Sequence, residues 1–91
     1  MIERLAPLKV DAFIDRTLGR DVFDTSFLLA RYPGSILNEQ LVAIDAKLAE
    51  LGEDGLLEFM AGDDILQAHD LDRITLDMVD AVRRLRAARF V

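Results

Sequence analysis

The sequence KVDAFIDRTLGRDVFDTSFLL, residues 9–29, determines the first part of the fold. Its apolar residues recur every three or four positions, which is typical of amphipathic helices. Lys9 and Arg16 lie seven residues apart, on the flank of the apolar face of the first helix. Gly19 offers a break, and the segment from about 20 to 32 is apolar nearly all round, as in a buried helix. We therefore expect two helices that form an antiparallel hairpin.

Two acidic residues, Asp21 and Asp24, lie three positions apart in the second of these helices. Their carboxylates therefore project from about the same face. Charged groups beside an apolar core are costly unless they are paired or bind a cation. The flank that carries Lys9 and Arg16 lies one tight turn away, and Arg20 directly precedes the acidic pair. The sequence predicts a closed ion-pair network among these five residues.

The rest of the chain also shows helical spacing, and strand-like alternation does not persist anywhere. Leucine and isoleucine at four-three spacing predict a third helix over about 35–52, with the glycine at its end as C-cap. A short helix should begin at Asp54 and end at Gly62, and another helical piece should include 65–66. Thr75 is the expected N-cap of the last helix. The apolar seam of the third helix consists of Leu37, Leu41, Ile44, Leu48 and Leu51.

Length and composition limit the architecture and the setting. Ninety-one residues, 52% of them hydrophobic, can form one small core, so we expect a single all-α domain over 1–91, a bundle of about five helices. No cysteine is present, which excludes disulfides and makes the cytoplasm the default location. No apolar run is long enough for a membrane helix. A net charge of −6 repels the phosphates of nucleic acids, so we do not expect the chain to bind nucleic acid on its own.

The aromatic residues and the single histidine favour structural roles. Phe13, Phe23, Phe27 and Phe59 occur at helical spacing, so we expect them in the core rather than in a stacking platform. His69 has no second imidazole or cysteine near it in the sequence, and we assign it no role.

The pattern Lys9-x6-Arg16-x3-Arg20-Asp21-x2-Asp24, with apolar residues in its gaps, resembles the later motifs of AbiEii-type nucleotidyltransferases. These are toxins of bacterial toxin–antitoxin or phage-defence systems that use magnesium. The resemblance covers the first third of the chain and implies a C-terminal helical part beside a nucleotide pocket. It implies that Lys9 is associated with the nucleoside triphosphate, and that Arg16 and Arg20 lie beside its phosphates or brace the acids. It also makes Asp21 and Asp24 the candidate catalytic residues.

The metal-binding half of that family, a Gly-Ser motif followed by an Asp-x-Asp pair on a sheet, has no counterpart here. Gly34-Ser35 precedes Asp45-Ala46-Lys47, but the latter lies within the expected third helix. We therefore expect no metal ligand on this chain, and magnesium and nucleoside triphosphate only together with the missing half. Thr25 stands where the family usually has leucine.

Two functional hypotheses follow from these patterns. In the first, the chain is the helical portion of an AbiEii-like nucleotidyltransferase. It helps to position the nucleotide, is inactive alone, and has the catalytic half or an antitoxin as partner. In the second, the five polar residues only fix the hairpin. The chain is then a non-catalytic interaction or dimerisation module that uses the apolar seam or the last helix, with a homodimer as one outcome.

Overall fold

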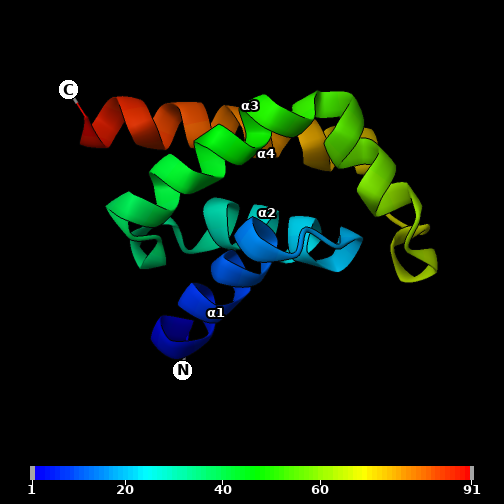
Figure 1. The fold of residues 1–91 in the computed structure, drawn as a ribbon, viewed down its shortest axis with the longest axis horizontal. Helices are drawn as coiled ribbons and strands as arrows, with labels where there is room; N and C mark the ends of the chain where they lie inside the picture. The colour runs from blue at the N-terminus through cyan, green and yellow to red at the C-terminus, as the bar shows by residue number, and fades with distance from the viewer. Residues whose placement is uncertain (1, 91) are drawn as a thin grey trace.

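The computed structural model describes the backbone of residues 2–90 and the side chains of residues 4–90. Within this part of the chain all regular structure is helical, which confirms the all-α class (Figure 1). There are four α-helices and two short 3₁₀ turns rather than about five helices. The elements are α1 (Ile2–Asp15), α2 (Gly19–Arg31), η1 (Pro33–Ser35), α3 (Asn38–Ala61), η2 (Asp64–Leu66) and α4 (Leu71–Arg89).

Helix α2 lies at the centre of the bundle. It packs against all three other helices, with α1 on one side and the α3–α4 layer on the other (Figure 1). Its core residues are Val22, Leu28 and Leu29, but its opposite side is exposed, so the expectation of a helix that is apolar and buried nearly all round is wrong. The core takes side chains from every helix, among them Val10, Phe13, Val22, Leu28, Leu41, Ile44, Leu56, Met60, Met78 and Val82.

The turn between α1 and α2 differs in detail from the expected break at Gly19. Helix α1 ends at Asp15, and Gly19 is already the first residue of α2. The chain reverses at Thr17, which has a φ of 52°. This left-handed conformation is unfavourable for a β-branched residue. The Thr17 hydroxyl is buried and donates a hydrogen bond to the Phe13 carbonyl, which holds the turn against α1.

The third and fourth expected helices are the two segments of α3, which meet at a kink at Gly52. Gly52 has φ 71° and ψ 172°, a combination that only glycine adopts readily. The glycine therefore interrupts the helical geometry, as predicted, and a second helical segment follows it. The bend is visible where α3 turns downward at its C-terminal end (Figure 1).

The prediction that Thr75 caps the last helix is wrong. Helix α4 begins at Leu71, and the Asp70 carboxylate accepts a hydrogen bond from the Arg73 amide as N-cap. Thr75 is buried within α4, and its hydroxyl donates to the Leu71 carbonyl. Aspartate and threonine are both favoured as N-cap residues, and here Asp70, the earlier one in the chain, caps the helix.

The apolar seam of the third helix packs inside the chain itself. Leu41, Ile44 and Leu48 are buried in the core, whereas Leu37 is exposed at the start of α3. The seam is therefore used for intramolecular packing. None of the described helices has the length and apolar character that a membrane crossing requires.

Candidate functional site

All five candidate residues lie on the α1–α2 hairpin, and the predicted contact between the basic flank and the acidic pair is present. The residues do not form one closed network. Arg16 pairs with Asp21 next to the turn, and Lys9 pairs with Asp24 farther along the two helices. This pattern of partners fits two helices that run in opposite directions.

The Arg16–Asp21 pair has the geometry of a structural contact. The Nε and Nη2 atoms of Arg16 donate to the two carboxylate oxygens of Asp21 at 3.0 and 2.7 Å. The Leu18 amide donates to the same carboxylate at 2.8 Å, which satisfies an otherwise free N–H at the start of α2. The Asp21 side chain is only 3% exposed, whereas that of Arg16 is 55% exposed. Asp21 thus ties the end of α1 to the start of α2.

These contacts make Asp21 a weak proton acceptor. Its pKa is lowered mainly by the hydrogen bond from Arg16, and also by the Leu18 amide and the charges of Arg16 and Arg20, against the opposing effect of burial. Asp21 in turn raises the pKa of Arg16. A carboxylate with a lowered pKa and engaged oxygens is better suited to holding a turn than to taking a proton.

The lowered pKa of Asp21 predicts a dependence of stability on pH. The folded state binds this proton less readily than the unfolded chain, whose aspartate pKa is about 3.9. The stabilisation is therefore present above that value and is lost as the pH falls through the lowered pKa of Asp21. We expect the difference in unfolding free energy between the chain and its Asp21→Asn variant to narrow below about pH 4. Urea unfolding at successive pH values measures it, and a constant difference would show that the charge is not responsible.

The Lys9–Asp24 pair has a different character. Lys9 Nζ lies 3.1 Å from Asp24 Oδ2, and the two side chains are 49% and 34% exposed. Exposed ion pairs contribute little to stability, on the order of 0–1 kcal/mol. Both groups can therefore exchange this contact for one with a ligand at small cost. Among the five candidate residues, Lys9 and Asp24 contact each other and are both accessible to solvent.

Arg20 stands apart from both pairs. It is exposed, and the described residues provide no hydrogen-bond or ion-pair partner for it. It borders a hollow of about 640 Å³ beside the hairpin turn. This hollow is lined by Leu18, Gly19, Arg20, Gly55, Glu58, Phe59, Gly62 and Asp63.

Two of the four phenylalanines are not in the core, contrary to the expectation from their spacing. Phe13 is fully buried and Phe23 is half-buried, but Phe27 and Phe59 are 47% and 41% exposed. Helical spacing alone did not identify the outer face of α2. A better signal was available, because Phe27 follows Asp24 by three positions and so must share the face of that charged residue.

Thr25 is a polar residue at a buried position of α2. Its side chain is fully buried, and its hydroxyl has no hydrogen-bond partner among the described residues. A buried unpaired hydroxyl is unfavourable by roughly 1–3 kcal/mol. The environment of the Thr25 side chain is therefore that of an apolar residue.

The acids of the hairpin do not form a magnesium site on their own. Nowhere in the described part of the chain do three or more His, Cys, Asp or Glu side chains gather as a group that could hold a metal ion. Asp21 faces a cation with both carboxylate oxygens, and Asp24 faces one with Oδ2. Asp45, which follows the Gly34-Ser35 pair in the sequence, forms an ion pair with Arg86 of α4.

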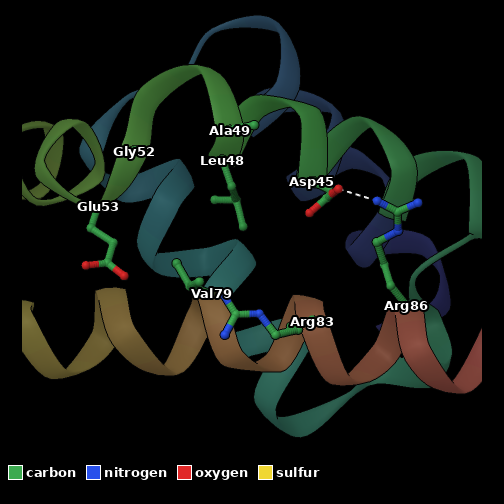
Figure 2. A pocket seen from close by; sticks show the side chains of 8 residues that line it. All are labelled: Asp45, Leu48, Ala49, Gly52, Glu53, Val79, Arg83 and Arg86. Atoms are coloured by element: carbon green, nitrogen blue, oxygen red, sulfur yellow. Dashed lines mark hydrogen bonds and ion pairs between the residues drawn. The ribbon is translucent and has the colours of Figure 1, made fainter.

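A separate cavity of about 460 Å³ lies between α3 and α4 (Figure 2). The Asp45–Arg86 pair lies at one end of it, and the carboxylate of Glu53 projects at the other. None of the five candidate residues reaches it. Its lining consists of Asp45, Leu48, Ala49, Gly52, Glu53, Val79, Arg83 and Arg86.

Comparison with known proteins found no match to this chain. The chain matches no family model, no curated protein and no solved structure.

Proposed function

We propose that this chain is the helical, nucleotide-facing portion of an AbiEii-like nucleotidyltransferase. The observation that supports the proposal best is the half-exposed Lys9–Asp24 pair, held on a hairpin that the Arg16–Asp21 pair locks. A rigid hairpin that carries an accessible cation and an accessible carboxylate side by side is suited to a reacting phosphate.

In nucleotidyl transfer, an acceptor hydroxyl oxygen bonds to the α-phosphorus while the bond to the leaving pyrophosphate oxygen breaks. Lys9 would neutralise phosphate oxygens, and Asp24 would take the proton of the acceptor hydroxyl or orient Lys9. Arg20, which is exposed, would contact phosphate as well. Arg16 and Asp21 act as positioning residues.

Magnesium belongs to the Gly-Ser/Asp-x-Asp half, which another polypeptide segment would have to supply. We therefore expect no nucleotidyl transfer by these 91 residues alone.

The two lysines of the chain, Lys9 and Lys47, provide an internal test. Lys47 lies on α3 and so is not part of the hairpin. We expect that titration with ATP and magnesium shifts the NMR signals of isotope-labelled Lys9 and leaves those of Lys47 unchanged. Lys9→Ala should weaken ATP binding by roughly tenfold or more, the effect of losing one charge-assisted contact, whereas Lys47→Ala should not.

Three other outcomes would count against the proposal. Equal shifts at both lysines would indicate unspecific attraction of a polyanion. Magnesium-dependent nucleotidyl transfer by the isolated chain would contradict the expected need for a second half. No shift at Lys9, together with concentration-dependent dimerisation, would favour the interaction-module hypothesis.

A further inference from the structure

The exposed residues of α2 form one continuous face. Arg20, Asp24, Phe27 and Arg31 follow one another at intervals of four, three and four residues, so they line the same side of the helix. We call these four residues the α2 outer face. Arg20, Phe27 and Arg31 are exposed and Asp24 is half-exposed. Lys9 of α1 reaches this face through its contact with Asp24.

The two ends of the α2 outer face differ chemically. The N-terminal end carries the exposed cation Arg20, and Lys9 reaches the middle of the face from α1 through its contact with Asp24. The C-terminal end is aromatic. The ring of Phe27 lies 6.1 Å from that of Tyr32, and the Arg31 guanidinium lies 5.8 Å from the centre of the Phe27 ring.

We infer that the base of a nucleoside triphosphate stacks on Phe27 and Tyr32 while its phosphates lie toward Lys9 and Arg20. This inference rests on the proposed function and assigns the base subsite of that function. Phe27 is 47% exposed although Tyr32 and Arg31 flank it, so ring surface is free for stacking. Seven residues separate Phe27 from Arg20, about 10 Å along the helix, a span that an extended nucleoside triphosphate can bridge.

The charge pattern supports a polyanionic nucleotide as the occupant. The chain carries a net charge of −6, yet two cations of this face, Arg20 and Arg31, have no ion-pair partner among the described residues. Lys9 is paired with Asp24, and Arg16 with Asp21.

The second exposed phenylalanine, Phe59, lines the hollow that contains Arg20 together with Glu58 and Asp63. These two acids outnumber the one cation there and would repel phosphates. Phe27 instead has the guanidinium of Arg31 beside its ring.

The experiment compares ATP with inorganic tripolyphosphate, which has the phosphates but no base. Base–aromatic stacking corresponds to roughly a tenfold change in affinity. We expect the chain to bind ATP about tenfold more tightly than tripolyphosphate. Phe27→Leu should bring the two affinities within about twofold of each other, whereas Phe59→Leu, the matched control, should keep the preference.

Tyr32 is the one tyrosine and tryptophan is absent, so intrinsic fluorescence reports on the aromatic end. ATP should quench it, and tripolyphosphate should not.

The outcomes separate the two proposals. If both ligands shift the Lys9 signals but Phe27→Leu keeps the preference for ATP, the base subsite is wrong and the proposed function stands. Equal affinity of the unmodified chain for the two ligands would likewise overturn the base subsite alone. If neither ligand affects Lys9, the proposed function fails, and the base subsite fails with it.

Discussion

Replacement of Asp21 by asparagine will lower the free energy of unfolding by about 2–3 kcal/mol, the range for losing hydrogen bonds to a buried charged group. The amide retains the shape of the side chain but presents an N–H group toward donors. Arg16 and the Leu18 amide would then face a group that cannot accept from all of them. Water remains able to solvate the exposed Arg16 guanidinium, but it has little access to the buried side chain at position 21. Urea unfolding followed by circular dichroism at neutral pH measures the difference.

Asp24→Asn is the matched control for this substitution. It makes the same chemical change three residues away on the same helix, but at a half-exposed side chain with one ion-pair partner. We expect the unfolding free energy to change by less than about 0.5 kcal/mol. Equal losses in the two variants would contradict the division of the hairpin into a structural pair and an accessible pair.

The second large effect is expected for Gly19→Ala. A methyl group at Gly19 would lie 2.5 Å from the Phe59 carbonyl oxygen and 3.2 Å from the Met60 Cα. Both are backbone atoms, so α2 and the C-terminal half of α3 would have to move apart. We expect a loss of about 1–3 kcal/mol in unfolding free energy, as for other overpacked sites, measured by the same urea titration.

Gly34→Ala serves as its control. Nothing lies within 4 Å of the position that a Cβ would take at Gly34, and its φ is not positive. Its replacement should therefore leave stability within about 0.5 kcal/mol. If Gly19→Ala were as harmless as Gly34→Ala, the close contact between α2 and α3 would not exist in solution.

The hairpin and its ion-pair partners were predictable because their determinants are local. Seven-residue spacing places Lys9 and Arg16 on one flank, three-residue spacing places Asp21 and Asp24 on one face, and a short turn brings the two surfaces together. The separation into two pairs was not predictable. It depends on the depth of each carboxylate and on the turn at Thr17, whose left-handed backbone no propensity rule favours.

The errors at the helix ends have a common physical cause, since several residues can serve the same purpose. Asp70 and Thr75 both carry side chains that cap helices, and tertiary packing decided that Thr75 would be buried. At Gly52, by contrast, the helical geometry is interrupted as predicted, and a second helical segment of α3 follows the kink. Phe27 was wrongly expected in the core, because periodicity shows which residues share a face of a helix but not which face packs against other helices.

The Arg16–Asp21 contact also bears on the order of folding. Only five positions separate the two residues, so bringing them together involves little loop-closure entropy compared with joining α1 or α2 to α4. Contacts this local form early in small helical proteins. The surface that carries Lys9 and Asp24 is thus shaped by contacts between residues that are close together in the sequence.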